Sequence, residues 1–375
     1  VPIAMRLPHR SCIVALLFLV TTTNRLAAVE TISLTLPTEF YGVVGEEMGL
    51  YFDNVVLAED SSGLTFKVNC DVGSAGDSGW KCTPQKSDVG FHVFSLSVRN
   101  KSGTSIAEAK STFFVSPPSP TRPLRVLVVG DSLTHASAYP NELYRLYEQN
   151  HDAPLVMLGT HHPASAMEHV NHEGYGGWTW QRFATHYEPN PDGTYRKKSS
   201  PFVFLGKDSK PDLDIPRYIR EQCAGDPPDV VFFMLGINDC FSATPDDKEA
   251  LDQRISAVLE HGERLMKAIR IAAPEADFAV CLTTPGNSRD AAFVANYQDR
   301  YPRWGWKRIQ HRLVIRQLKQ YGDRHKDGIF IVPTELNLDV TDGYPDNNAV
   351  HPNAVGYKQI GNSLYSWLEW REANR

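Results

Sequence analysis

The chain lacks a hydrophobic run long enough to cross a membrane, and it has no excess of positive charge. The run CIVALLFLV, which starts at Cys12, holds nine residues, well short of the ~20 that span a bilayer. The formal net charge is −6, so neither nucleic acid nor an anionic membrane surface is an expected partner. We therefore expect a globular protein with no stable membrane anchor.

The first residues have the order of a secretory signal. Arg6 and Arg10 precede the apolar run, and the small residues of LAAVE follow it. We interpret residues 1–28 as a signal peptide and expect a secreted or periplasmic protein. No Cys directly follows the small residues, so a lipid anchor is not expected.

Cysteine is scarce, with six residues in 375. Cys70 and Cys82 bracket the loop DVGSAGDSGWK. In an oxidising compartment they either close this loop as a disulfide or remain thiols, because spacing alone does not give the geometry that a disulfide needs. The cysteines farther along the chain are interpreted as buried thiols: Cys223, Cys240 and Cys281.

Residues 29–116 have the pattern of short strands. Alternating runs are separated by turns rich in Gly, Asp and Ser, which predicts a small antiparallel β-sandwich of the Ig-like kind. The expected strands are TISLTL, MGLYF, LTFKVNC, FHVFSLSVRN and KSTFFVS. A Pro-rich stretch follows, and we interpret residues 117–123 as a stiff linker between two domains.

Residues 124–375 have a different pattern, in which continuous apolar runs alternate with helical periodicity. The runs are RVLVV, PLVML, DVVFFML, DFAVCL and GIFIVP. Such continuity is typical of strands buried on both faces, so we expect a parallel sheet between layers of helices. Ligands of such sheets bind where the strands end at their carboxyl termini.

Three polar side chains follow predicted strands at that edge. Ser132 follows the first run, Asn238 follows the third, and His351 lies in the polar segment after the fifth. A serine hydroxyl becomes nucleophilic when a base takes its proton, and the attacked carbonyl needs donors for the charge on its oxygen. We predict Ser132 as nucleophile, His351 as base, and Asn238 as a donor beside the backbone amides of Ser132 and Gly177.

These residues lie in four motifs: VVGDSL, EGYGGWT, LGIND and AVHPNAVGY. In type and order they resemble the motif blocks of the SGNH (GDSL) hydrolase superfamily, over roughly residues 124–370. The resemblance implies a flavodoxin-like three-layer α/β/α fold and ester hydrolysis through an acyl-serine. It assigns the same roles to Ser132, His351, Asn238 and Gly177, and the proposed chemistry needs neither a cofactor nor a metal.

One position departs from the family pattern. The family has Asp three residues before the His, and here that position is Asn348. An amide oxygen can orient the imidazole but cannot offset the charge of an imidazolium. Three interpretations stay open: Asn348 or a backbone carbonyl orients His351, a nearby acid such as Asp346 or Asp342 substitutes, or the site is impaired.

Other polar and aromatic residues near the motifs have two interpretations each. Tyr175 and Trp178 flank the glycine motif and either bind substrate or belong to the core. Asp131 and Asp239 are expected to bond loop amides and hold the shape of the site. A group of histidines and acids in one short segment is interpreted as a polar loop rather than a metal site: His161, His162, Glu168, His169, His172 and Glu173.

The substrate is predicted more coarsely than the reaction. We expect a secreted esterase that hydrolyses carboxylic esters of carbohydrates, acetyl esters first. The alternatives are a broad-specificity carboxylesterase or lipase-like enzyme, and a carbohydrate-binding protein with an impaired hydrolase site. Whether Ser132 reacts distinguishes the two esterases from the binding protein.

Overall fold

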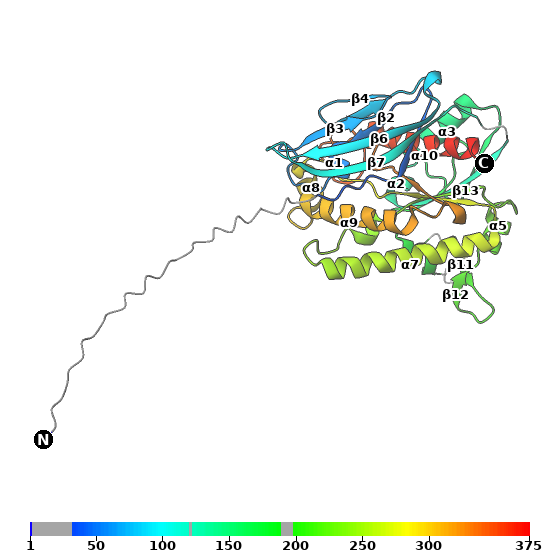
Figure 1. The fold of residues 1–375 in the computed structure, drawn as a ribbon. Helices are drawn as coiled ribbons and strands as arrows, with labels where there is room; N and C mark the ends of the chain where they lie inside the picture. The colour runs from blue at the N-terminus through cyan, green and yellow to red at the C-terminus, as the bar shows by residue number, and fades with distance from the viewer. Residues whose placement is uncertain (2–31, 120–121, 189–197) are drawn as a thin grey trace. The chain divides into compact units, whose positions relative to one another are not determined.

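The protein is described by a computed structural model, in which residues 2–31, 120–121 and 189–197 lie outside the described part. Apart from Val1, the predicted signal peptide 1–28 therefore lies outside the described residues. The contacts of the chain group Thr31–Arg375 into one compact unit (Figure 1). No helix of the described residues is both long and apolar enough to span a membrane.

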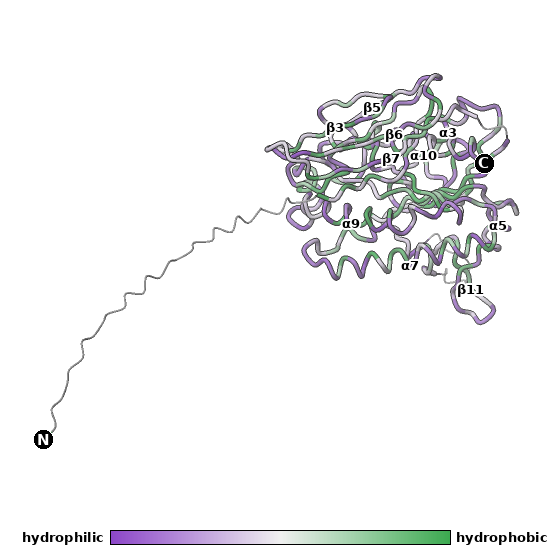
Figure 2. The backbone as a smooth tube through the Cα atoms, in the orientation of Figure 1, coloured by the Kyte–Doolittle hydropathy of each residue, from purple (hydrophilic) through white to green (hydrophobic). Residues whose placement is uncertain are grey.

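The centre of this unit is a parallel sheet built from the five predicted apolar runs. Its strands are β8 (Leu124–Gly130), β9 (Leu155–Leu158), β13 (Val230–Met234), β14 (Asp277–Cys281) and β15 (Ile329–Val332). The order β9-β8-β13-β14-β15 is the flavodoxin-like order, and the short β10 (Glu173–Gly174) pairs with the end of β8. Figure 2 shows hydrophobic residues gathered in these central strands, as burial on both faces requires.

Helices cover both faces of the sheet, which confirms the predicted three-layer α/β/α fold. The helices α3 (Ala138–Asn150) and α10 (Ala354–Ala373) pack together on one face. The other face carries α4 (Trp180–Thr185), α5 (Ile215–Gln222), α7 (Lys248–Ala272) and α9 (Arg303–Tyr321), as Figure 1 shows for α7 and α9. The hairpin of β11 (Val203–Leu205) and β12 (Pro211–Leu213) lies between α4 and α5 in sequence.

Two short helices begin directly after strands of the sheet, and a third begins nine residues after one. They are α2 (Ser132–His135) after β8, α6 (Ile237–Cys240) after β13 and α8 (Asp290–Tyr297) after β14. The 3₁₀ turns are η1 (Lys86–Asp88) and η2 (His325–Asp327). The carboxyl ends of the strands thus lead into helix starts, the arrangement that presents polar residues to a ligand.

The amino-terminal part forms two small sheets. One has the order β1-β7-β6-β3, and the other has the order β2-β5-β4. Their bounds are β1 (Glu39–Val43), β2 (Met48–Tyr51), β3 (Thr65–Asn69), β4 (Ser74–Ala75), β5 (Gly79–Cys82), β6 (Gly90–Arg99) and β7 (Ser105–Ser116), with α1 (Phe52–Val55) after β2. The rings of Phe40, Trp80, Phe94 and Phe113 pack edge-on or stacked in the core that the two sheets share.

Four of the five predicted strands are present, as β2, β3, β6 and β7, whereas the prediction for TISLTL was wrong and two details of the sandwich differ. TISLTL does not form a strand in its described residues, where Leu34 makes one isolated bridge to Val56, and the first strand is β1 instead. The pair β1–β7 is parallel, although an antiparallel sandwich was expected. The expected loop between Cys70 and Cys82 contains β4 and most of β5. Strand pairing over long sequence distances decides such features, and local patterns do not report it.

The cysteines of the described part are all free thiols, including Cys70 and Cys82. Of the two states considered for Cys70 and Cys82, a disulfide or two thiols, the structure therefore has the thiols. Cys82 is buried in β5, opposite Met48 of β2, and burial raises the pKa of its thiol to about 11. A thiol with such a pKa stays protonated and unreactive near neutral pH.

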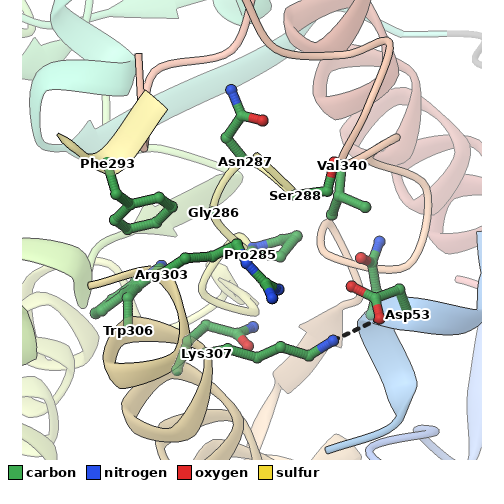
Figure 3. Close-up of a pocket in the computed structure, with 12 residues that line it drawn as sticks. Asp53, Pro285, Gly286, Asn287, Ser288, Phe293, Arg303, Trp306, Lys307 and Val340 are labelled. Carbon is green, nitrogen blue, oxygen red and sulfur yellow. Dashed lines mark ion pairs between the residues drawn. The ribbon is translucent and has the colours of Figure 1, made fainter. Parts of the chain in front are cut away.

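The amino-terminal sheets are bonded to the segment that follows β15. Asn54 Nδ2 donates to the carbonyls of Glu335 (2.6 Å) and Leu338 (2.8 Å), and the Tyr51 amide donates to the Leu336 carbonyl (3.0 Å). Figure 3 shows the cavity beside these contacts, where Lys307 of α9 pairs with Asp53 at 2.6 Å. The start of the segment that leads to His351 is thereby fixed from the amino-terminal side.

Candidate active site

The turn between β8 and α2 holds Ser132 at the edge of the sheet. Asp131 caps α2 by accepting a hydrogen bond from the Leu133 amide at 3.0 Å. At Gly130, the last residue of β8, a Cβ atom would lie 1.9 Å from Thr134 Oγ1. Only glycine permits this close approach, so the chain can turn sharply and present Ser132 at the start of the helix.

Ser132 and His351, far apart in the sequence, meet at this edge. Ser132 Oγ lies 2.9 Å from His351 Nε2, and His351 Nδ1 lies 3.2 Å from Asn348 Oδ1. The backbone amides of Val350 (3.2 Å) and His351 (3.0 Å) donate to the same Asn348 atom, which must therefore be the amide oxygen. An oxygen there requires the proton on Nδ1, which leaves Nε2 free to accept the Ser132 proton.

The imidazole is neutral in this arrangement. Burial lowers the pKa of His351, because removal from water disfavours the charged form of the ring. In the described part of the chain, neither acid considered as a substitute bonds to the His351 ring, whose Nδ1 faces Asn348. Asp346 pairs with Arg289 at 3.3 Å with its side chain 90% exposed, and Asp342 bonds through its backbone to Asp339. Asn348 is therefore the side chain that orients His351.

The loop carrying Asn348 is held by a residue that sequence reasoning missed. Asn287 Nδ2 donates to the carbonyls of Pro345 (2.8 Å) and Asn348 (3.0 Å), and its backbone amide donates to the Ala349 carbonyl (2.8 Å). Asn287 lies in the segment TTPGNSRD after β14. The rule that selected Asn238, a polar residue following a buried strand, would also have selected Asn287.

Asn238 lies in α6, beside the turn that carries Ser132. Its Nδ2 atom donates to the Trp178 carbonyl at 3.2 Å and to Asp131 Oδ2 at 3.3 Å. Both bonds are long, so a substrate oxygen can replace one of them at small cost. Gly177, one residue before Trp178, has a φ of +75° and no atom within 4 Å of the Cβ position. The three segments with predicted donors therefore meet around Ser132.

A comparison with known proteins assigns the family. The sequence profile of the GDSL-like lipase/acylhydrolase family matches residues 126–364, which is more than half of the chain. The protein belongs to this family. It is accordingly a carboxylic ester hydrolase with the SGNH hydrolase fold. No curated protein has a sequence that matches this chain.

Among solved structures, the GDSL hydrolase is similar to a family 3 carbohydrate esterase of Clostridium thermocellum, with 21% identity over 65% of this chain and 94% of the other and a TM-score of 0.40. A family 3 carbohydrate esterase from Talaromyces cellulolyticus has 16% identity, covers 67% and 99% of the two chains, and has a TM-score of 0.44. An acetyl xylan esterase, AlAXEase, has 13% identity over 65% and 100%, with a TM-score of 0.36. The family assignment rests on the sequence match alone.

Two buried carboxyl groups lie under the site of the hydrolase. Burial raises the pKa of Asp131 to about 7 and that of Asp239 to about 7, where the nearby Asp131 charge adds to the effect. Asp239 Oδ1 accepts a bond from the Trp180 amide at 3.0 Å, and its second oxygen is buried without a partner in the described residues. Both acids bond to backbone amides, and Asp131 also holds the Asn238 side chain.

The structure separates the two aromatic candidates. Trp178 is only 6% exposed, and its ring packs against Tyr175 (4.7 Å between centroids) and Phe183 (4.8 Å), with the Arg182 guanidinium 5.6 Å from the ring. Of the two interpretations of Trp178, the structure shows the core position, because neighbouring side chains cover the indole. Tyr175 is half-buried and stays a candidate for substrate binding.

Proposed function

We propose that the hydrolase is a secreted serine esterase that removes acetyl groups from carbohydrates through an acyl-serine intermediate. The observation that carries the proposal is the line of atoms Ser132 Oγ, His351 Nε2 and Nδ1, and Asn348 Oδ1, with separations of 2.9 Å and 3.2 Å. This line supplies a nucleophile, a base with a free nitrogen, and a group that fixes the tautomer.

The first half of the reaction forms the acyl-enzyme. His351 Nε2 takes the Ser132 proton while Oγ forms a bond to the ester carbon, and the carbonyl oxygen becomes an oxyanion. The backbone amides of Ser132 and Gly177 and the Asn238 side chain donate hydrogen bonds to that oxygen. The bond from the carbon to the sugar oxygen then breaks, and the sugar oxygen leaves with the proton from the imidazolium.

The second half consumes water. His351 Nε2 takes a proton from water, and the resulting hydroxide equivalent attacks the acetyl carbon. The bond to Ser132 Oγ breaks, Oγ regains the proton from the imidazolium, and acetic acid leaves. No cofactor takes part in these steps.

Asn348 limits the rate of both halves. Each half passes through an imidazolium, and the amide oxygen of Asn348 attracts that cation less strongly than a carboxylate would. In one serine protease the change from Asp to Asn costs about 10⁴ in turnover, which is an upper guide for this site. We therefore propose an active but slow esterase.

The choice of carbohydrate esters and of export rests on the sequence. The net charge of −6 disfavours an anionic membrane surface as substrate, and the order of Arg6, Arg10 and the apolar run supports export. The alternatives are a broad carboxylesterase or lipase-like enzyme and a carbohydrate-binding protein with an impaired site.

The test measures acetate release from a panel of acetylated polysaccharides and from p-nitrophenyl acetate, with Ser132→Ala as control. We expect release that disappears in the variant, together with labelling of Ser132 by a fluorophosphonate. Activity on aryl esters alone would support the broad carboxylesterase. A folded wild-type protein that is neither labelled nor active would support the binding protein.

A further inference from the structure

Four rings form a continuous row beside the nucleophile. The rings of His135 and His161 lie nearly parallel, with 5.1 Å between centroids and 17° between planes, His161 packs on Tyr175 at 4.9 Å, and Tyr175 packs on Trp178 at 4.7 Å. His135 Nδ1 lies 2.8 Å from His161 Nε2, so one imidazole donates a hydrogen bond to the other. We call these four side chains the ring row.

The ring row reaches the site from both sides. His135 lies in α2 three residues after Ser132, the spacing that places two side chains on one face of a helix. The Tyr175 amide donates to the Gly130 carbonyl at 3.1 Å, and the Trp178 carbonyl accepts a bond from Asn238. The row therefore runs from the nucleophile helix to the oxyanion donors.

Buried hydrogen bonds hold the ring row in place, and three of its four rings are accessible to solvent. The Tyr175 hydroxyl donates to Glu173 Oε2 at 2.5 Å, and the same buried carboxylate accepts from the Thr160 amide and the Tyr218 hydroxyl, each at 2.8 Å. Trp178 is buried under Tyr175, whereas His135 is exposed and His161 and Tyr175 are half-buried. Rings held in place by such contacts lose little conformational entropy when a ligand binds.

We propose that His135, His161 and Tyr175 form the subsite for the sugar ring that carries the acetyl group. The inference rests on the proposed function, and it names a neutral pyranose as the substrate class. A pyranose presents a face of C–H groups that packs on aromatic and imidazole rings, and its hydroxyls can bond to imidazole nitrogens. A subsite one helical turn from Ser132 places an ester oxygen of that sugar next to the nucleophile.

The histidines in and beside the ring row are not arranged as a metal site in the described residues. Within the described ranges, no group of three or more His, Cys, Asp or Glu side chains is arranged to hold a metal ion. His172, the neighbour of His161 in the row's loop, bonds to Ser137 Oγ (2.9 Å) and to the Gly174 amide (3.0 Å), and burial lowers the pKa of its imidazole to about 3. Its neutral ring holds the backbone that leads to Tyr175.

The experiment compares two substrates in His135→Ala and His161→Ala. We expect the ratio of kcat/KM for an acetylated xylo-oligosaccharide to kcat/KM for p-nitrophenyl acetate to fall about tenfold or more, through KM for the oligosaccharide, as the loss of stacking and a hydrogen bond predicts. His161→Phe keeps a flat ring and should recover part of the loss. The control is His169→Asn, an exposed residue of the same loop whose ring makes no ring contact in the described part of the chain.

A binding measurement separates this inference from the proposed function. In the Ser132→Ala background, calorimetry with the acetylated xylo-oligosaccharide should give a Kd that rises about tenfold when His135→Ala is added. A wild type that turns over both substrates, with ratios and Kd equal in the His135, His161 and control variants, would overturn the subsite alone. An inactive wild type whose binding still depends on His135 would overturn the proposed function and leave the subsite.

Discussion

Replacing Asn348 by Asp tests the reasoning on the base most directly, because the change adds one charge and removes no observed bond. Asn348 Oδ1 accepts from His351 Nδ1 and from the amides of Val350 and His351, and a carboxylate oxygen can accept all three. The Nδ2 group that is lost has no partner in the described residues. The side chains of Asn and Asp have nearly the same shape, so the loop should keep its conformation.

The expected magnitude follows from Coulomb's law. Two unit charges about 4 Å apart attract by about 4 kcal/mol at an effective dielectric constant of about 20. His351 is only partly buried, so solvent reduces this attraction, and we expect the pKa of His351 to rise by about 1 to 2. The same attraction stabilises the imidazolium of the transition state and should raise kcat by about 10- to 100-fold.

The assay is the pH profile of kcat/KM for p-nitrophenyl acetate in wild type and Asn348→Asp. The acid limb, which reports the free base, should move to higher pH in the variant while the plateau rises. Asn348→Ala, which removes the acceptor, should lower the plateau without raising the limb. If Asn348→Asp moves neither the limb nor the plateau, His351 is not the base or Asn348 does not orient it.

Three further variants test the surroundings of the site. Asn287→Ala should lower the free energy of unfolding by about 1–3 kcal/mol and lower kcat more than it raises KM, because two carbonyls of the Asn348 loop lose their donor. Denaturation and kinetic assays that give the same stability and kcat as the wild type would contradict the role of Asn287 in holding this loop. Gly177→Ala should lower kcat about tenfold or more, because the φ of +75° at Gly177 disfavours a Cβ atom and the backbone amide must turn away. Gly176→Ala, at a position with open space and no positive φ, should keep a kcat near that of the wild type. If instead Gly176→Ala has the lower kcat, the donor is the amide of Gly176. Asp239→Asn should flatten the pH dependence of stability. The folded-state pKa of about 7 lies above the unfolded value near 4, so this carboxyl makes the wild type lose about 1.4 kcal/mol per pH unit as pH rises between them. The wild type should lose melting temperature between pH 5 and pH 8, and this loss should be smaller in Asp239→Asn. An equal loss in the two proteins would refute the raised pKa.

The sequence predicted most of the parallel sheet because its signal is local. Five continuous apolar runs, each bounded by turns and followed by a helical pattern, correspond to β8, β9, β13, β14 and β15. Burial on both faces requires such runs, and the carboxyl-end rule then places Ser132, Asn238 and His351 at one edge. The amino-terminal strands were harder to predict, since pairings such as β1 with β7 join segments about seventy residues apart and local alternation does not encode the partner.

Within the site, the sequence by itself determined which residue types follow the strands, and through them the family and the reaction. Only the tertiary structure decided which polar group faces His351, because Asn348, Asp346 and Asp342 lie within a few residues of one another and the turn of the loop selects between them. It also decided that Trp178 is covered while Tyr175 and His135 line a row of rings, since burial depends on segments that meet only after folding. Periodicity and motif order are properties of neighbouring residues, whereas contact and exposure are properties of the folded chain.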